Sequence, residues 1–206
     1  MTRTIIQAVI TLTVLSLLLF VLWPKPEPLY PTAGSTVVVF GDSLAAGVGS
    51  SRGNDITTLL AASLDYPIIN RGVSGDTTAD GLARIESTAQ ADPRVVVVLL
   101  GGNDAIQKKP IEETFKNLAE IIRIIQSTGA AVVLVGEPGG LYGKEYEKEY
   151  RRLAEEYRTF YVSNILSGLI GRPEYMSDYI HPNDKGYAVA TARILPEVQR
   201  ALAGSN

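Results

Sequence analysis

The feature that most narrows the possible folds is an unbroken apolar run from Val95 to Leu100. Its side chains do not alternate between apolar and polar, so a strand formed here would be buried on both faces. Such strands are typical of the centre of a parallel sheet that helices cover on each side. The run therefore predicts an α/β fold.

Apolar runs predict strands on four other stretches of the chain as well. Together with residues 94–100, the expected strands are residues 35–40, 67–70, 130–136 and, more weakly, 159–162. Segments of helical pattern lie between them. This alternation of strand and helix implies a parallel sheet with right-handed crossovers and helices on both faces.

Three helices are predicted with defined positions. Two of them show an apolar stripe at helical spacing, and a third is expected from about Asp184 to Leu202. One stripe comprises Ile111, Phe115, Leu118, Ile122 and Ile125, and the other comprises Tyr146, Tyr150, Leu153 and Tyr157. We interpret both stripes as faces that pack on the sheet rather than as ligand sites.

The first 23 residues differ in composition from the rest of the chain. Residues 5–23 carry no charged side chain, and these 19 residues suffice for a helix across a hydrocarbon core of ~30 Å. Arg3 precedes them, which favours an N-terminus on the cytoplasmic side. We expect residues 1–23 to be a membrane anchor. A cleaved signal peptide is the alternative, although Trp23 and Pro24 make a poor cleavage site.

A proline-rich stretch separates this segment from the remainder of the chain. Four prolines fall within residues 24–31, and proline at this density cannot continue a helix. It favours an extended polyproline conformation, so we interpret residues 24–34 as a semi-rigid spacer. Residues 35–206 are then of a length that suits a single domain.

Composition excludes several classes of function. The chain of 206 residues has no cysteine, so disulfides, thiolate catalysis and cysteine-based metal sites are absent. With a single histidine besides, we expect no zinc site and no other metal. The formal net charge is −3, which argues against nucleic acid as a partner because such proteins present a basic face.

Polar side chains follow three of the predicted strands. The first strand leads into Gly41-Asp42-Ser43-Leu44, the second into a segment that contains Gly75, and the third into Gly101-Gly102-Asn103-Asp104. In an open parallel sheet, functional groups collect at the carboxyl ends of the strands. These three segments, with the loop that begins at Asp178 before the last helix, are therefore expected to meet at one edge.

The only histidine, His181, defines one hypothesis for this edge. A serine hydroxyl is a poor nucleophile until a base takes its proton, and imidazole is the usual base. Ser43 is the candidate nucleophile, and Asp178, three residues before His181, can hold the imidazole tautomer. The alternatives are structural: Ser43 as a helix N-cap, Asp178 as a loop cap and His181 as a packed histidine.

Two further residues are candidates for stabilising a developing oxyanion. Gly75 lets the backbone approach a substrate closely, and the Asn103 side chain offers an N–H₂ group. The alternative is that the glycines merely permit turns. A second match, the G-x-S-x-G pattern at residues 49–53, is interpreted as chance, because that motif requires a strand directly before its serine.

Taken in order, these four segments resemble the four sequence blocks of the GDSL, or SGNH, hydrolases. Ser43 lies in a segment similar to the first block, Gly75 to the second, Asn103 to the third, and Asp178 and His181 to the last. The similarity extends over residues 35–206. It is greatest to the bacterial arylesterase, lysophospholipase and acyl-CoA thioesterase I type.

The resemblance implies a fold and a mechanism. The fold is a flavodoxin-like three-layer α/β/α sandwich, and the reaction needs no cofactor. Ser43 would attack an ester carbonyl, with His181 as base and Asp178 holding His181. The N–H groups of Ser43 and Gly75 and the side chain of Asn103 would form the oxyanion hole.

The resemblance leaves the substrate open. A small-molecule or lipid ester is expected, cleaved by a membrane-anchored esterase whose catalytic domain lies outside a bacterial-type inner membrane. Release to the periplasm or medium after signal cleavage is the alternative localisation. Leu141 and Tyr142, in a loop rich in glycine, are candidates for contact with the acyl chain, and an ordinary surface loop is the alternative.

Two other functions remain open from the sequence. One is a carbohydrate O-acetyl esterase of the cell envelope. The other is a non-catalytic flavodoxin-like module that binds phosphate or a nucleotide at residues 41–49. That loop contains no lysine or arginine, and the binding module predicts no dependence on His181.

Overall fold

The computed structural model describes residues 27–137 and 143–204, together with Gln7, Ile10 and Thr13. The rest of the predicted membrane anchor and the acyl-contact candidates Leu141 and Tyr142 lie outside the described residues. Within the described part of the chain, no helix combines the length and the apolar character needed to cross a membrane.

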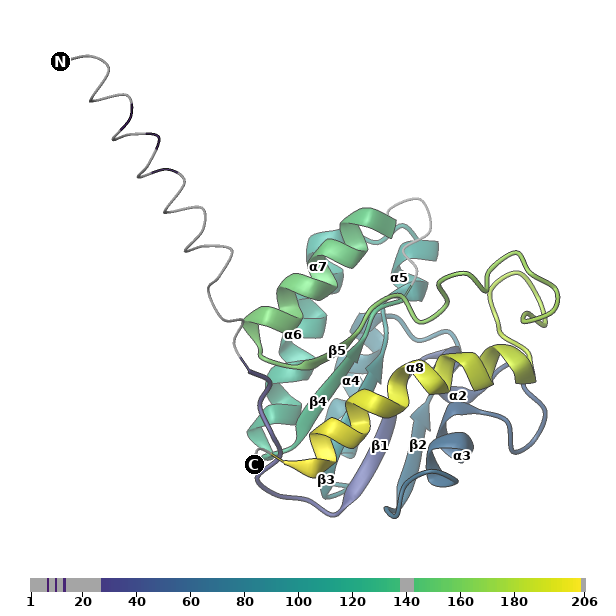
Figure 1. Cartoon of the computed structure of the whole chain (residues 1–206), viewed down its shortest axis with the longest axis horizontal. Helices are drawn as coiled ribbons and strands as arrows, with labels where there is room; N and C mark the ends of the chain where they lie inside the picture. The colour runs from purple at the N-terminus through teal and green to yellow at the C-terminus, as the bar shows by residue number, and fades with distance from the viewer. Residues whose placement is uncertain (1–6, 8–9, 11–12, 14–26, 138–142, 205–206) are drawn as a thin grey trace.

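Five parallel strands form a single sheet in the order β2-β1-β3-β4-β5 (Figure 1). They are β1 (Thr36–Gly41), β2 (Ile68–Gly72), β3 (Pro93–Leu99), β4 (Ala131–Val135) and β5 (Phe160–Val162). Each predicted strand is present, with ends that differ by one or two residues. The central strand is β3, as its apolar run predicts.

Helices cover both faces of the sheet (Figure 1). One layer comprises α2 (Ser43–Ala46), α3 (Ile56–Ala61) and α8 (Asp184–Ala203), and the other comprises α4 (Thr78–Ala89), α6 (Ile111–Ser127) and α7 (Gly143–Glu156). The short α5 (Gly102–Ile106) follows β3. The arrangement is a three-layer α/β/α sandwich.

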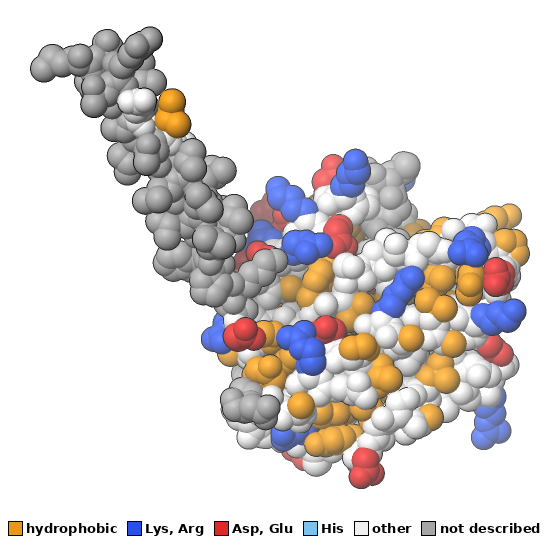
Figure 2. All heavy atoms as spheres, viewed as in Figure 1, with side chains coloured by type: hydrophobic (Ala, Val, Ile, Leu, Met, Phe, Trp, Pro, Cys, Tyr) orange, Lys and Arg blue, Asp and Glu red, His pale blue; other side chains and the backbone are white. Residues whose placement is uncertain are grey.

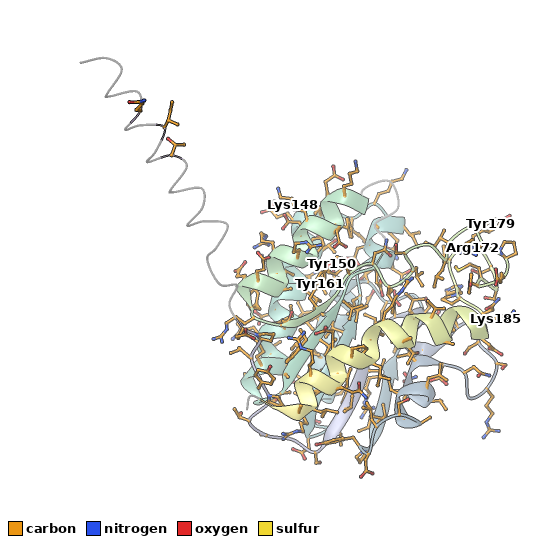
Figure 3. All side chains as sticks on the ribbon, viewed as in Figure 1. Lys148, Tyr150, Tyr161, Arg172, Tyr179 and Lys185 are labelled. Atoms are coloured by element: carbon orange, nitrogen blue, oxygen red, sulfur yellow. The ribbon has the colours of Figure 1, made fainter. Side chains whose placement is uncertain are left out.

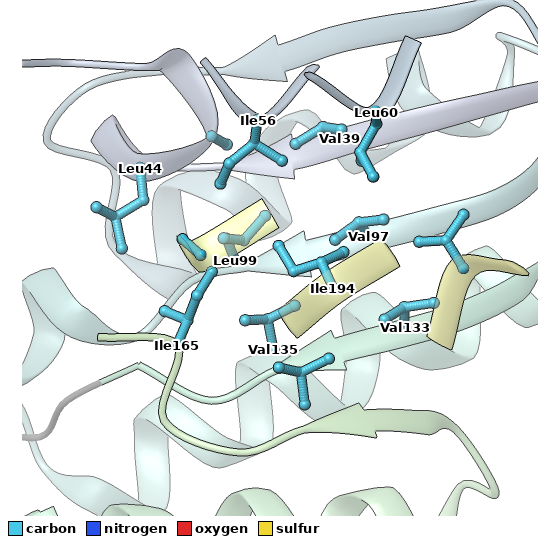
Figure 4. Close-up of a cluster of buried hydrophobic side chains, with 14 of the residues drawn as sticks. Val39, Leu44, Ile56, Leu60, Val97, Leu99, Val133, Val135, Ile165 and Ile194 are labelled. Atoms are coloured by element: carbon cyan, nitrogen blue, oxygen red, sulfur yellow. The ribbon is translucent and has the colours of Figure 1, made fainter. Parts of the chain in front are cut away.

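The two faces of each strand divide the core into two clusters. On β3, Val95, Val97 and Leu99 face the α8 layer, as Figure 4 shows for Val97 and Leu99. Val96 and Val98 face the α4 and α6 layer, and all five side chains are fully buried. Burying one such side chain contributes about 1.5–3 kcal/mol, so an uninterrupted apolar strand is stable only between two layers.

The predicted helix stripes pack as expected. On α6, Phe115, Leu118, Ile122 and Ile125 are buried, while Ile111 at the first turn is half-buried. Tyr150 comes from α7 (Figure 3). Its ring packs edge-on against Phe115, and its hydroxyl donates to Leu100 O at 2.6 Å. Tyr157 lies just beyond the end of α7.

At the carboxyl edge of the sheet, the end of β1 lies close to the backbone of β3. A Cβ atom on Gly41 would lie 2.0 Å from Leu99 O, so only glycine allows β1 to pass this close to β3. The chain leaves β1 toward β2 on one side and returns to β3 on the other. This reversal is the topological switch point, where open α/β sheets bind their ligands.

The outer surface is mixed in character. On the face shown in Figure 2, the basic and acidic side chains of the described residues are interspersed with apolar ones. Ile106, Ile170, Tyr179 and Ile180 are large apolar side chains with substantial exposure. All four belong to segments at the carboxyl edge of the sheet, so exposed apolar surface gathers beside the predicted site.

Candidate active site

Ser43 lies where β1 turns directly into α2. Asp42 is the N-cap of this helix, and its Oδ1 accepts a hydrogen bond from the backbone N–H of Leu44 at 2.9 Å. The alternative in which Ser43 serves as the N-cap is therefore wrong, because Ser43 is the first helical residue. Its side chain is left available to the pocket that it lines.

His181 reaches Ser43 from the loop before α8. The distance between His181 Nε2 and Ser43 Oγ is 3.1 Å, although the two residues are 138 positions apart in the chain. On the other side of the ring, His181 Nδ1 lies 2.7 Å from Asp178 Oδ2. If Nδ1–H donates to Asp178, Nε2 is left as the acceptor for the serine proton.

Asp178 is organised by its own loop. Its Oδ1 accepts from the backbone N–H groups of Ile180 at 2.8 Å and His181 at 2.7 Å. The hydrogen bond from the His181 side chain, followed by these two backbone bonds, lowers the pKa of Asp178 to about 2. Asp178 therefore stays ionised through the mildly acidic range and continues to hold the imidazole there.

Backbone pairing holds this loop in place. Met176 and Pro182 form an isolated antiparallel bridge, and Ser177 N–H donates to His181 O at 2.9 Å. Asn183 then caps α8 through hydrogen bonds from the N–H groups of Lys185 and Gly186. The tight turn that the Asp-x-x-His spacing predicts is present.

Asn103 lies beside Ser43, but its side-chain amide is already hydrogen-bonded. Asn103 Nδ2 donates to Asp42 Oδ2 at 3.0 Å and to Asp76 O at 2.9 Å. An oxyanion at Ser43 would have to compete with these acceptors. The position of Asn103 suits the predicted role. To serve as an oxyanion donor, its amide must turn one N–H away from Asp42 or Asp76 O and toward the oxyanion.

Gly75 lies in the exposed turn between β2 and α4. Its φ is +90°, and a Cβ atom there would meet open space. Gly75 is outside the group of described residues that line the pocket at Ser43. The bond from Asn103 to Asp76 O nevertheless holds this turn next to the start of α5.

A pocket of about 270 Å³ opens at Ser43. Its polar floor contains Ser43, Asn103 and His181, together with Asp42, Gly102 and Glu137. Its walls are mainly apolar and comprise Leu44, Ala105, Ile106, Leu166, Ile170, Tyr179 and Ile180. A few convergent polar groups within apolar walls are typical of a small-molecule site.

A larger surface hollow, of about 570 Å³, lies between α6 and α7. Charged side chains such as Lys116, Glu145 and Arg152 line much of it, and the described lining contains no predicted site residue. Within the described residues, no cluster of three or more histidine and acidic side chains suited to a metal ion is present. Three of the predicted site residues, Ser43, Asn103 and His181, line the pocket at Ser43 instead.

Two residues that organise this edge escape prediction from the sequence. Asp104 is buried and accepts from Thr78 N–H at 2.8 Å and from Thr78 Oγ1 at 2.6 Å, which joins α5 to the start of α4. Arg84 on α4 donates to Asp76 Oδ2 at 2.6 Å and to Gly41 O at 2.8 Å. Thr78 is 26 positions from Asp104, and Gly41 is 43 positions from Arg84, so no local pattern signals these two contacts.

Glu137 is a third residue that no sequence pattern identifies. It follows β4, is 3% exposed, and its Oε2 accepts from Gly102 N–H at 2.7 Å. Burial, above all, raises the pKa of its carboxyl group well above the ordinary value. A polar side chain directly after a buried strand was the only available signal.

Comparison with known proteins agrees with this geometry. A model of the GDSL-like Lipase/Acylhydrolase family matches residues 39–189. "Esterase TesA" of Pseudomonas aeruginosa is 33% identical over 162 residues, which cover 73% of this chain and 81% of the relative. "Thioesterase 1/protease 1/lysophospholipase L1" of Escherichia coli K12 is 30% identical over 160 residues, 73% of this chain and 77% of the relative.

Solved structures show the same arrangement of the chain. The crystal structure of TesA superposes with a TM-score of 0.71 at 33% identity, over 81% of this chain and 97% of that one. The SGNH-hydrolase family esterase AlinE4 gives a TM-score of 0.64 at 32% identity, over 82% and 97% of the two chains.

Replacing Arg84 by methionine should destabilise the carboxyl edge of the sheet. The guanidinium group also donates to Arg71 O at 2.8 Å, so the change leaves Asp76 and two carbonyl groups without a charged donor. We expect a loss of about 1.5–3 kcal/mol in the free energy of unfolding, measured by urea denaturation.

Arg123→Met is the matched control. Arg123 pairs with Glu120 on the same helix, and solvent-exposed pairs of this kind contribute little to stability. Equal losses in the two variants would contradict the organising role of Arg84.

Proposed function

This chain belongs to the GDSL-like lipase/acylhydrolase family and is a serine hydrolase that acts on ester bonds, and we propose that Ser43, His181 and Asp178 carry out its reaction. One observation carries the assignment of residues. A continuous line of hydrogen-bonding groups runs from Ser43 Oγ through His181 to Asp178, and it opens into a pocket with apolar walls.

In the proposed first step, Ser43 Oγ attacks the carbonyl carbon of the ester. His181 Nε2 takes the serine proton, and Asp178 stabilises the imidazolium that forms. The carbonyl oxygen becomes an oxyanion as the tetrahedral intermediate develops. His181 then gives the proton to the departing alcohol, which leaves the acyl group on Ser43.

Water completes the proposed cycle. It takes the place of the alcohol, His181 removes its proton, and the hydroxide adds to the acyl carbonyl. Collapse of the second tetrahedral intermediate releases the acid and restores the serine hydroxyl with the proton from His181. Each proton is returned within the cycle, so no metal or organic cofactor enters the proposal.

The oxyanion is proposed to bind the N–H groups of Ser43 and Gly75 and the side chain of Asn103. Asn103 Nδ2 lies between Asp42 and Asp76 O, so it can lend one hydrogen to the oxyanion when charge develops. A donor of this kind typically contributes about 10²–10³ in kcat.

The walls of the pocket support an acyl ester with an apolar chain as the substrate. Ala105, Ile106 and Ile180 flank the polar floor at which the ester would react. Arylesterase and lysophospholipase activities both fit such a substrate. Contact of Leu141 and Tyr142 with the acyl chain remains a proposal, since both lie outside the described residues.

The carbohydrate O-acetyl esterase remains the second enzyme candidate, because an acetyl group also fits beside Ser43. Membership of an acylhydrolase family favours either enzyme over the non-catalytic binding module. The two enzymes differ in how much of the apolar wall the substrate contacts, since an acetyl group would leave most of the wall without contact.

A location at the membrane is proposed from the sequence alone. The uncharged residues 5–23 and the preceding Arg3 favour an anchor with the catalytic domain outside the cytoplasm, and a cleaved signal peptide remains the alternative. Residues 27–36 lead from this segment to β1 and can hold the domain near a membrane. Tethering of this kind raises the effective concentration of a lipid substrate.

Ser43→Ala and His181→Ala should each abolish most ester hydrolysis while the protein stays folded. Asp178→Asn keeps the shape of the loop but favours the wrong imidazole tautomer, so kcat should fall by about 10³–10⁴. Initial rates on a short aryl ester measure the effect, and circular dichroism confirms folding. Turnover near the wild-type rate in the Ser43 or the His181 variant would refute the mechanism.

Ala105→Phe should shorten the accepted acyl chain. The added ring would occupy the apolar wall, so kcat/KM for an octanoyl aryl ester should fall by about tenfold or more relative to the acetyl ester. The acetyl ester is the internal control for damage to the catalytic groups. A wild-type protein that hydrolyses acetyl esters and not octanoyl esters would favour the carbohydrate esterase instead.

A further inference from the structure

A buried carboxyl group beneath the pocket has no role in the mechanism above. Glu137 enters from the end of β4, and its Oε2 accepts from Gly102 N–H at 2.7 Å. The other oxygen, Oε1, is buried and receives no N–H or hydroxyl donor within the described structure. A buried acceptor without a donor lowers the stability of the fold by about 1–3 kcal/mol. We therefore expect Oε1 to have a partner other than an N–H or a hydroxyl group.

The Asp42 carboxyl group is the candidate partner. Asp42 and Glu137 line the same pocket, both side chains are only 3% exposed, and burial and Asp42 raise the pKa of Glu137. Two ionised carboxylates have no hydrogen to share, so a hydrogen bond between them requires a proton. Pairs of neighbouring carboxyl groups that hold one proton are known from sites where both cannot ionise together.

The hydrogen bonds around the pair indicate which residue carries the proton. Asp42 accepts from Leu44 N–H and from Asn103 Nδ2, and each of these bonds favours its charged form. Glu137 accepts one N–H, from Gly102. The proton therefore resides on Glu137 Oε1, which donates to the Asp42 carboxylate.

The neighbouring acidic side chains also favour retention of this proton. Asp104 on α5 raises the pKa of both carboxyl groups, and Asp76 of the turn before α4 raises that of Asp42. His181, in the loop before α8, acts in the opposite direction and lowers the pKa of Asp42. Burial is the largest cause of the raised pKa values of Asp42 and Glu137.

The third neighbour, Tyr150 on α7, remains neutral. Burial and the nearby Glu137 raise the pKa of its hydroxyl well above the usual range, and that hydroxyl donates to Leu100 O. In the described chain, neither carboxyl group forms an ion pair with a lysine or arginine. A proton held between Asp42 and Glu137 therefore offsets the repulsion between the two carboxyl groups.

We propose that Glu137 is a positioning residue whose carboxyl proton joins the Ser43 turn to the loop that carries Asn103. The inference rests on the proposed function. Asp42 belongs to the Ser43 turn, and Glu137 holds Gly102, the residue before Asn103. This proton bridge between Asp42 and Glu137 sets the distance between the nucleophile, Ser43, and an oxyanion donor, Asn103.

The proton also governs how strongly Asp42 holds Asn103. With the proton in place, the pair carries one negative charge, and Asn103 Nδ2 can release a hydrogen to the oxyanion. When the proton is lost, Asp42 and Glu137 repel each other, and the second charge strengthens the hold of Asp42 on Asn103. Loss of the proton as pH rises should therefore lower kcat.

Gly102 leaves room for the Glu137 carboxyl group beside its backbone. A Cβ atom there would lie 2.6 Å from Glu137 Oε2, so a side chain at this position would displace the carboxyl group. Glutamine has the shape of a protonated glutamic acid and can donate to Asp42 while accepting from Gly102. Leucine has a similar volume but offers neither hydrogen bond.

The test compares Glu137→Gln and Glu137→Leu with the wild type in the full-length protein. The steady-state rate on a short aryl ester is measured from pH 6 to pH 10, with the spontaneous hydrolysis subtracted. Glu86→Gln, which removes the same charge from the exposed face of α4, is the matched control. The wild type and the Glu86 variant should both lose kcat at alkaline pH.

Glu137→Gln should keep most of the kcat at neutral pH and lose the alkaline fall. Glu137→Leu should lower kcat by about tenfold to a hundredfold at all pH values, with KM changed by less than about threefold. A Glu137→Gln profile that falls like the wild type would overturn the proposal, as would a Glu137→Leu variant with wild-type kcat. A merely structural role predicts lower stability without a change in the profile.

A measurement on the wild type does not depend on whether the variants fold. With ¹³C at the side-chain carboxyl carbons of glutamate, one glutamate should titrate at a pH well above that of all the others. If every glutamate titrates in the acidic range, the proposal is wrong. If the protein hydrolyses esters through Ser43 but every glutamate titrates in the acidic range, the proposed function stands and only the proton bridge between Asp42 and Glu137 is wrong.

Discussion

The parallel pairing of β1 with β3 is the constraint on which the rest of the structure depends. It brings the turn at Asp42 and Ser43 beside the loop at Asn103, across 61 residues of chain. Gly41 makes the close approach possible, because any side chain there would collide with Leu99 O. The nucleophile, its pocket and the candidate oxyanion donor all follow from this one contact.

The same contact concentrates polar groups where the fold would otherwise bury only apolar ones. Asp42, Asp104 and Glu137 are each at most 3% exposed, within a short distance of the ends of β1, β3 and β4. Their hydrogen bonds to Leu44, Thr78 and Gly102 compensate part of the cost of burial. Arg84 supplies a positive charge at the edge of this polar cluster. At its centre, the proposed proton between Asp42 and Glu137 takes the place of a basic side chain. A rigid polar network under the serine is the arrangement expected where catalytic groups must be held in position.

The sequence predicts features that depend on the burial of one segment or on residues close together in the chain. Val95 to Leu100 had to be a central strand, since both of its faces avoid water, and the spacing of Asp178 and His181 implies their turn. Gly-Asp-Ser after an apolar strand placed Ser43 at the sheet edge, although the helix cap proved to be Asp42. The roles of Arg84, Asp104 and Glu137 depend largely on distant partners: Gly41 is 43 positions from Arg84, Thr78 is 26 from Asp104, and Gly102 is 35 from Glu137. Such contacts leave no pattern in the sequence. The membrane anchor and the acyl contacts of Leu141 and Tyr142 stay predictions.

The central claim is that His181 activates Ser43 as a nucleophile, and covalent labelling tests it most directly. The purified protein is treated with a fluorophosphonate, which reacts with activated serines, and the modified peptide is identified by mass spectrometry. The account predicts one adduct per chain, on Ser43, that disappears in the His181→Ala variant. A folded protein that forms no adduct on Ser43, or one whose labelling persists without His181, would contradict it.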